Sequence, residues 1–393
     1  MQPKAGDNIP LAIQAREDAV SGRLVERLTD NSADFAVTYF TKEMFTPDNH
    51  GVLVASNRTG EWLPYMILPD ERVMRCLSTT PMNAWSSPAI GGERVIFVSK
   101  EGQLGFVPLG GGEFTPVFQL PPDRHWSEVS ASSCGRYAVM TYMEKTGPTT
   151  QRISDGSFPS SGSEGMAYGP RSVVLWVDLD TGISKGITGA NAYLAHAMLS
   201  PIDPHLIEYC NALPWSQTQR MWTARYFPEA MFVDVQPLFR QKPGIDAVGH
   251  EFFLQDGRLA AIWLKYTKVG AHAHEPSETF LLIADPRTRK SKAFRTPGLL
   301  FNHLHGRDGK VFVSEGRSSV ALKKALTSNP HELDLLCRYD VKGERAKATV
   351  LCVHGSSWKG QLGHPHAVVC RENKHCYFNS DRDGHCNVYR VRM

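Results

Sequence analysis

One short unit recurs along this 393-residue chain and limits the folds that the chain can adopt. Each copy consists of an apolar strand, a polar turn that resembles SPDG, and a second apolar strand. The seven copies span residues 45–56, 90–99, 132–142, 200–210, 254–264, 306–316 and 370–381. Their turns follow one another at intervals of roughly 40 to 70 residues, a spacing that is typical of the blades of a β-propeller.

The segments between these copies also favour strands. Residues 172–182 and 279–290 are rich in β-branched and apolar side chains, and helical periodicity is nearly absent. We therefore predict an all-β fold, a seven-bladed β-propeller that comprises residues 1–393 as a single domain. The last copy lacks an outer strand, and we expect a strand near 24–30 to complete it and close the ring. Two insertions are expected, a surface loop at 147–170 and a short helix at 317–328.

Composition excludes several classes of partner. The chain has 43 Lys and Arg against 40 Asp and Glu, so the net charge of +3 gives no electrostatic reason to expect nucleic acid or an anionic membrane. The first residues contain no apolar core of signal-peptide length, and no apolar run of about 18 residues follows. The eight cysteines form no CxxC pair. Unpaired thiols suit a reducing compartment, so we expect a cytoplasmic protein of undetermined oligomeric state.

Histidines precede the turns of four consecutive copies of the unit. Because the innermost strand of each blade lines the channel of a propeller, these side chains are expected to meet near its axis. They are His196, His250, His303, and His364 with His366.

The last two of these histidines form an HPH sequence. The period-two alternation of a strand would place His364 and His366 on the same side, where Gln361 and His303 would complete four nitrogen and oxygen donors. Such donors suit a divalent ion such as Mn²⁺, Zn²⁺, Fe²⁺ or Ni²⁺, and of these we predict Mn²⁺. The alternative is a group of hydrogen-bonded channel histidines that bind no metal.

Motifs spread over nearly the whole chain resemble those of one enzyme family. They are VERLTD, YFTKEMFTPDNHGVLVASNRTG, DPHLIEYCNALPW, QRMW, GHEFFLQDG, NHLHGRDG, SSWKG, QLGHPH and NSDRDGHCNVY. The chain resembles the oligogalacturonate lyases, seven-bladed propeller enzymes of intracellular pectin breakdown. The resemblance implies a metal-dependent lyase that cleaves short oligogalacturonates by β-elimination and releases unsaturated uronate products.

The same resemblance assigns the site residue by residue. The family's metal ligands correspond to His303 in NHLHGRDG and to Gln361, His364 and His366 in QLGHPH. The catalytic Arg lies in a segment similar to QRMW, which indicates Arg220, and the catalytic His lies in the HEF segment, which indicates His250.

These two roles are chemically reasonable. Elimination requires removal of the C5 proton of a uronate, and a cation that neutralises the adjacent carboxylate stabilises the resulting charge. We expect His250 to be the base and Arg220 the carboxylate partner, and the reverse division stays open. The structural alternatives are a histidine packed between strands and an arginine paired with an acidic neighbour.

Three segments depart from the family pattern. AVTYF at 36–40 replaces paired histidines before LYF, NALPW at 211–215 replaces HEGP, and the stretch between SSWK and QLGHPH is shorter. These departures leave two alternatives open. One is a related lyase for another uronate-containing oligosaccharide, of ulvan-like or rhamnose-glucuronate type. The other is a non-catalytic propeller that binds a sugar or a protein.

Overall fold

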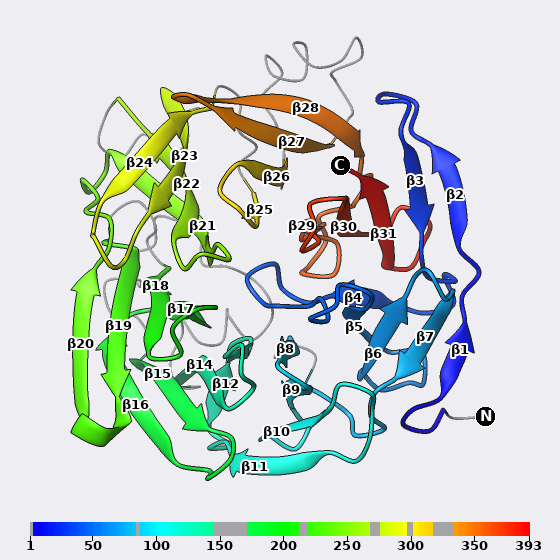
Figure 1. The fold of residues 1–393 in the computed structure, drawn as a ribbon, viewed down its shortest axis with the longest axis horizontal. Coiled ribbons are helices and arrows are strands. Elements are labelled where there is room, and N and C mark those ends of the chain that lie inside the picture. Colours follow the sequence, from blue (N-terminus) through cyan, green and yellow to red (C-terminus); the bar gives the residue numbers. More distant parts are fainter. Residues whose placement is uncertain are drawn as a thin grey trace.

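Antiparallel strands arranged in a ring make up the protein, as the computed structural model in Figure 1 shows. The structure describes residues 3–83, 87–144, 171–212, 218–267, 276–296, 302–316 and 334–393. Within these ranges one 3-10 turn, η2 (Pro228–Ala230), is the sole helical element. No helix in the described ranges has the length and apolarity needed to cross a membrane. The predicted all-β fold is confirmed, and the expected insertions at 147–170 and 317–328 lie outside the described residues.

Each blade, defined here as one meander of consecutive strands, has its first strand nearest the axis. The first blade contains β4 (Phe35–Val37), β5 (Val52–Ser56), β6 (Leu63–Leu68) and β7 (Val73–Cys76). The second contains β8 (Ala89–Gly91), β9 (Arg94–Val98), β10 (Gln103–Pro108) and β11 (Thr115–Gln119). The third contains β12 (Arg124–Trp126), β13 (Ser130–Ala131), β14 (Tyr137–Glu144), β15 (Arg171–Asp178) and β16 (Ser184–Asn191).

The remaining blades follow in chain order. The fourth contains β17 (Leu194–Leu199), β18 (Leu206–Asn211), β19 (Met221–Phe227) and β20 (Phe232–Pro237). The fifth contains β21 (Asp246–Phe253), β22 (Leu259–Lys265), β23 (Glu278–Ala284) and β24 (Ser291–Arg295). The sixth contains β25 (Leu304–Gly306), β26 (Val311–Gly316), β27 (Leu335–Lys342) and β28 (Arg345–Val353), and the seventh contains β29 (Val368–Val369), β30 (His375–Ser380) and β31 (Asn387–Arg392).

Hydrogen bonding groups these seven meanders into six sheets. The fifth and sixth blades share one eight-stranded sheet because β24 and β28, their outermost strands, join through a single parallel bridge between Arg295 and Arg345. All other neighbours within that sheet are antiparallel. Six of the seven recurrent turns connect the first two strands of a blade, and the turn in the third blade connects β13 to β14.

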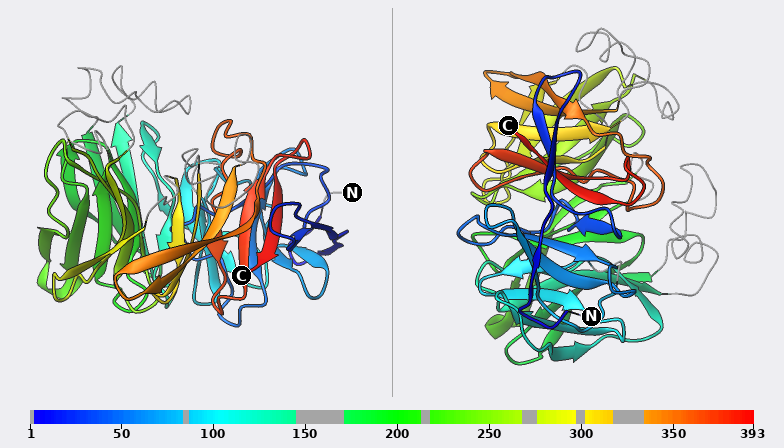
Figure 2. Two further views of the ribbon diagram at one scale, coloured as in Figure 1. Left: turned by 90° about the horizontal axis from the view of Figure 1, so that it is seen from above. Right: turned by 90° about the vertical axis from the view of Figure 1, so that its right-hand side faces the viewer.

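The N-terminal segment joins the last blade to the first. β3 (Leu24–Arg27) pairs with the final strand β31, with Val25 opposite Val391, and β2 (Gln14–Glu17) pairs with β3. β1 (Asn8–Pro10) instead adds to β7 at the outer edge of the first blade. Figure 2 shows this segment running along the outside of the ring. The two blades at the ends of the chain are therefore held by one continuous stretch of backbone.

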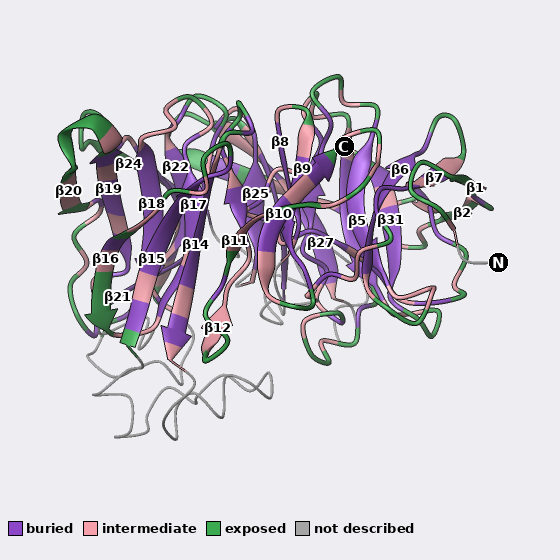
Figure 3. Cartoon of the chain, turned by 90° about the horizontal axis from the view of Figure 1, so that it is seen from below, coloured by how far each residue is buried: buried purple, intermediate pink, exposed green. Residues whose placement is uncertain are grey.

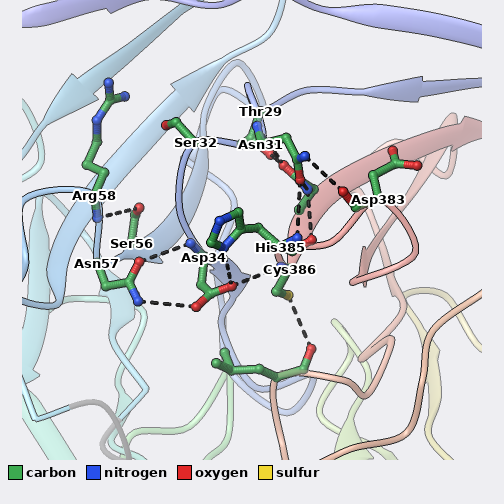
Figure 4. A network of polar contacts seen from close by, with 12 residues as sticks. Thr29, Asn31, Ser32, Asp34, Ser56, Asn57, Arg58, Asp383, His385 and Cys386 are labelled. Atoms are coloured by element: carbon green, nitrogen blue, oxygen red, sulfur yellow. Dashed lines mark hydrogen bonds and ion pairs between the residues drawn. The ribbon is translucent and has the colours of Figure 1, made fainter.

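Polar side chains strengthen this seam, the contact between the N-terminal segment and the seventh blade, as Figure 4 shows. The Asp34 carboxylate accepts hydrogen bonds from the backbone N–H of Cys386 at 3.0 Å and from the Asn57 side chain at 3.2 Å. The Asn31 side chain donates to the carbonyl of Asp383 at 2.9 Å. The tight turn between β30 and β31 is thereby fixed against the beginning of the chain.

The inner strands are interrupted where they approach the axis. In β17 the register shifts between Ala195 and Met198, and in β21 it shifts between Gly249 and Phe252. In the third blade β12 and β13 pair with the same strand, β14, on either side of a break. Bulges of this kind re-aim side chains. Outer strands such as β16 and β20 are more exposed than the buried strands behind them (Figure 3).

The pairing of β3 with β31 yields a stability prediction. Val25 is 1% exposed and packs in the core of the seventh blade, so Val25→Asp would bury an unpaired carboxylate. We expect the free energy of unfolding to fall by about 3 kcal/mol or more. The measurement is urea denaturation followed by tryptophan fluorescence.

Leu24→Asp is the matched control on the same strand. Leu24 is 57% exposed, so this variant should change the free energy of unfolding by less than about 0.5 kcal/mol. Equal effects of the two substitutions would show that β3 does not contribute its inner face to the core.

Candidate active site

A cavity of about 610 Å³ lies beside the axis of the ring. Its inner end is lined by Tyr39, His196, Gln361 and His366, and its outer part extends to the segment from Pro121 to Glu128. Cavities of this size and mixed polarity bind small organic molecules. The inner end is where the histidines predicted to converge are found.

Three histidines form a compact group of nitrogen donors. One ring nitrogen each of His303, His364 and His366 lies within 4.8 Å of the others. Within the described part of the chain, Nδ1 of His364 and Nε2 of His366 are buried without a hydrogen-bond partner. Buried nitrogens without partners are costly, and a cation at this point would satisfy them. The donor set therefore fits a single divalent ion.

The reason for the convergence of His364 and His366 differs from the predicted one. The HPH sequence does not lie on a strand: it forms the end of a turn before β29, and the backbone N–H of His364 donates to the carbonyl of Gln361 at 3.2 Å. His366 has φ of 44°, in the left-handed region. The period-two argument was therefore wrong, because a turn and a strained backbone aim these rings. Gln361 begins the same turn, and its role as fourth ligand stays a prediction.

A buried carboxyl group orients the third donor. Oε1 of Glu315, on β26, lies 2.5 Å from Nδ1 of His303, and the Glu315 side chain is fully buried. Burial raises the pKa of Glu315 well above its ordinary value. A carboxyl group bonded to one ring nitrogen holds the ring in place, so that the other nitrogen can be presented to a metal. Sequence reasoning missed Glu315, although a lone Glu inside the apolar strand VFVSEG was a signal.

The histidines are held in the uncharged form. Burial lowers the pKa of His303, His364 and His366 below the ordinary value, and neighbouring histidines add to this shift for His303 and His366. Neutral imidazole is the form that binds a metal ion. The geometry of the three histidines and their uncharged form therefore both favour metal binding.

Arg220 lies just before β19 and is paired with an acidic neighbour. Its Nε and Nη2 donate to the two carboxylate oxygens of Glu251 at 2.8 and 3.1 Å, and both side chains are buried. Burial would raise the pKa of Glu251, but Arg220 outweighs it and lowers that pKa to about 2. The pair is thus ionised. This bidentate contact occupies one edge of the guanidinium.

His250 lies beside the proposed metal ligands. Its ring centroid is 4.9 Å from that of His303 and 5.9 Å from that of Phe40, and it takes φ of 55° at the bulge in β21. Burial lowers the pKa of His250 well below its ordinary value, and His303 and Arg220 lower it further. The half-buried ring is neutral and can accept a proton, although it is not among the residues that line the cavity.

The segment that departs from the family pattern covers these histidines. Tyr39 stacks on His196 with ring centroids 5.1 Å apart, and its centroid is 5.2 Å from that of His366. Phe40 lies 4.9 Å from His303. The loop from 38 to 44 that carries them reaches toward the centre of the ring (Figure 1). Aromatic rings therefore stand next to the nitrogens of the candidate metal site.

An ion-pair network anchors the end of this loop. The Glu43 carboxylate accepts from Arg307 at 2.9 and 3.2 Å and lies 3.1 Å from Arg371. Burial would raise the pKa of Glu43, but the two arginines lower it. Because Arg307 and Arg371 follow the first strands of the sixth and seventh blades, the loop is tied to the two blades that carry the metal donors.

Comparison with known proteins identifies the family. The sequence profile of the family described as oligogalacturonate lyase matches residues 4–393. The chain belongs to the oligogalacturonate lyase family. It is 23% identical to the oligogalacturonide lyase of Pectobacterium atrosepticum and 23% identical to the oligogalacturonate lyase of Dickeya dadantii. Each alignment covers 99% of this chain and 98% of the relative.

Solved structures of this family share the fold. An oligogalacturonate lyase in complex with manganese superposes with a TM-score of 0.79 at 22% identity, over 100% of this chain and 98% of the other. The oligogalacturonate lyase of Vibrio parahaemolyticus gives a TM-score of 0.80 at 22% identity, over 99% and 98%. The arrangement of the blades is thus that of the family.

The metal site yields a binding prediction. His303→Ala should abolish high-affinity binding of a divalent ion, and Glu315→Gln should weaken it about 10- to 100-fold because the ring of His303 loses its orienting carboxylate. Isothermal titration with Mn²⁺ measures both effects.

His205→Ala is the control. His205 lies in the turn between β17 and β18, where Nδ1 bonds to the carbonyl oxygen of Tyr226 at 3.0 Å, so this variant should bind Mn²⁺ like the wild type. Full metal binding by His303→Ala would remove His303 from the ligand set.

A buried carboxyl near Arg220 is left without hydrogen bonds. Both carboxylate oxygens of Glu208, on β18, are buried without a partner in the described part of the chain. Burial raises the pKa of Glu208 well above its ordinary value, Glu251 raises it further, and Arg220 and Lys42 oppose the shift. Glu208 therefore retains its proton to a higher pH in the folded protein than in the unfolded chain.

This shift predicts a pH-dependent stability. The unfolded chain releases the Glu208 proton above about pH 4.5, whereas the folded protein retains it, so stability falls by about 1.4 kcal/mol per pH unit as pH rises toward the folded pKa. Glu208→Gln removes this titration. The melting temperature of the variant should therefore rise relative to that of the wild type between pH 5 and pH 8.

The exposed Glu229 of η2 provides the comparison for this measurement. Glu229→Gln should leave the pH dependence of the melting temperature unchanged. Parallel curves for Glu208→Gln and the wild type would contradict the assignment of a protonated Glu208.

Proposed function

We propose that this protein is an oligogalacturonate lyase that cleaves short oligogalacturonates by β-elimination and releases unsaturated uronate. The observation that carries the proposal is the group of three histidines, two of them with unpartnered buried nitrogens, at the inner end of a cavity in a member of this family. A cavity of this volume suits a short oligosaccharide rather than a long polymer.

The proposed metal is Mn²⁺, held by His303, His364 and His366 with Gln361 as the fourth ligand. Nitrogen donors with one amide oxygen suit this ion, and a solved relative is a complex with manganese. The bound ion would neutralise the uronate carboxylate and make the C5 proton more acidic.

We assign the C5 proton to His250 and the uronate carboxylate to Arg220. His250 is uncharged and adjacent to His303, as a base near the metal must be. Arg220 donates to Glu251 through Nε and Nη2 and to the carbonyl oxygen of Ala212 through Nη1, and its guanidinium supplies positive charge to the substrate. When the proton leaves C5, its electron pair forms the C4=C5 double bond and the C4–O4 bond breaks, so no water is consumed.

The cysteines support a cytoplasmic location for this reaction. All eight are unpaired, and seven of them are buried. Proteins of oxidising compartments generally pair their cysteines, whereas cytoplasmic proteins do not.

The test is the ultraviolet absorbance of the conjugated C4=C5 uronate during incubation with digalacturonate. We expect absorbance to rise with added Mn²⁺ and to stay flat with a chelator. His250→Ala and Arg220→Ala should each lower kcat by about 100- to 10,000-fold, because each removes a group that acts on the reacting uronate. His205→Ala serves as the control and should retain wild-type turnover.

Two outcomes would contradict these assignments separately. No absorbance change with metal-loaded wild-type protein would refute the substrate. Normal turnover by both the His250 and the Arg220 variants would instead place proton removal elsewhere.

A further inference from the structure

A histidine outside the metal group is held against a carboxylate on the cavity wall. Nδ1 of His196 lies 2.7 Å from Oε1 of Glu128, and both residues line the cavity. The side chains are 22% and 13% exposed, so they contact solvent without standing free in it. Because Nδ1 of His196 is bonded to Glu128, Nε2 is the ring nitrogen that remains for a molecule in the cavity.

Both residues occupy interruptions of inner strands in neighbouring blades. Glu128 lies in the break between β12 and β13, and His196 lies in the bulge of β17. His196 takes φ of 55°, a left-handed conformation that is unfavourable for a non-glycine residue. Such strain tends to persist where side-chain direction matters for function.

Two further groups fix the orientation of this pair. Lys42 has a fully buried side chain; its Nζ donates to the carbonyl oxygen of Ala197 at 3.0 Å and lies 3.7 Å from Oε1 of Glu128. Burial alone would raise the pKa of Glu128, but Lys42 and His196 outweigh it and lower that pKa to about 2. Tyr39 stacks on the imidazole with an interplanar angle of 5°. The carboxylate is therefore ionised and the ring cannot turn away from it.

Elimination requires a second proton transfer that the metal group and His250 leave unassigned. The glycosidic oxygen leaves C4 of the uronate with the departing sugar. It becomes an alkoxide unless an acid supplies a proton as the C4–O4 bond breaks. An imidazole whose Nδ1 is bonded to a carboxylate can hold such a proton on Nε2, and His196 lines the cavity. Glu128, Lys42 and the Tyr39 ring lie close to the imidazole of His196. His303 and His366 lie farther from this imidazole.

We propose that His196, positioned by Glu128, donates the Nε2 proton to the glycosidic oxygen as it leaves C4 with the departing sugar. This inference rests on the proposed function. The step balances: the C5 proton passes to the base, the C5–H electrons form the double bond, and the C4–O4 electrons stay on oxygen, which takes the His196 proton. Exchange with solvent then restores both groups, and no oxidant or reductant is needed.

The test compares two leaving groups. With digalacturonate, the glycosidic oxygen must take up a proton as it leaves C4. The methyl glycoside of 4-deoxy-4-fluorogalacturonate instead expels fluoride, which needs no proton. His196→Asn is the variant of choice because asparagine tolerates the left-handed backbone. We expect kcat to fall about 100-fold or more with digalacturonate and less than about 5-fold with the fluoride substrate.

Glu128→Gln tests the positioning role. It should lower kcat for digalacturonate by about tenfold or more with little change in KM, and should leave both Mn²⁺ binding and fluoride release near wild-type values. A purely structural role would reduce the rates with both substrates together. His205→Ala, in the turn that follows β17, is the control and should react like the wild type with both.

The possible outcomes separate this inference from the proposed function. Wild-type turnover of digalacturonate combined with equal losses by His196→Asn for both substrates would overturn the acid assignment alone. Full activity of His196→Asn with digalacturonate would do the same. No conjugated product from either substrate with the wild-type protein would overturn the proposed function and this inference with it.

Discussion

The antiparallel pairing of β3 with β31 is the interaction on which the rest of the structure depends. Without it the last blade would present β31 as an unpaired edge, and the backbone link that joins the last blade to the first would be lost. The polar contacts of Asp34 and Asn31 with the turn before β31 lie at the same seam. Once the ring is closed, the first strand of every blade must face the axis, and side chains distant in the sequence are brought into one small volume.

Regular strands alone would not build the site. Alternating side chains would point along the sheet faces, toward the neighbouring blades, rather than into the channel. The bulges at His196 and His250, the break at Glu128 and the turn at His366 re-aim these groups. All four residues have a left-handed or interrupted backbone that packing elsewhere must sustain, so the stability of the outer strands supports the geometry of the centre.

The sequence predicted those features that depend on local chemistry. The seven polar turns were found because Asp, Asn and Gly mark a tight turn directly, and the convergence of the channel histidines followed from the ring. It could not reveal that His366 adopts a positive φ, because no local signal marks that backbone conformation in histidine. Nor could it pair His196 with Glu128, which lie 68 residues apart, or join the fifth and sixth blades through one bridge between Arg295 and Arg345.

The placement of the metal donors couples ligand binding to the mechanics of the ring. His303 belongs to the sixth blade, whereas His364 and His366 precede the seventh, the blade completed by β3. An ion bound by these residues would act as a clamp that joins the sixth blade to the seventh, next to the pairing of β3 with β31. By thermodynamic linkage, an ion that binds the closed ring more tightly than the open ring opposes opening, and opening lowers the affinity for the ion by the same coupling free energy.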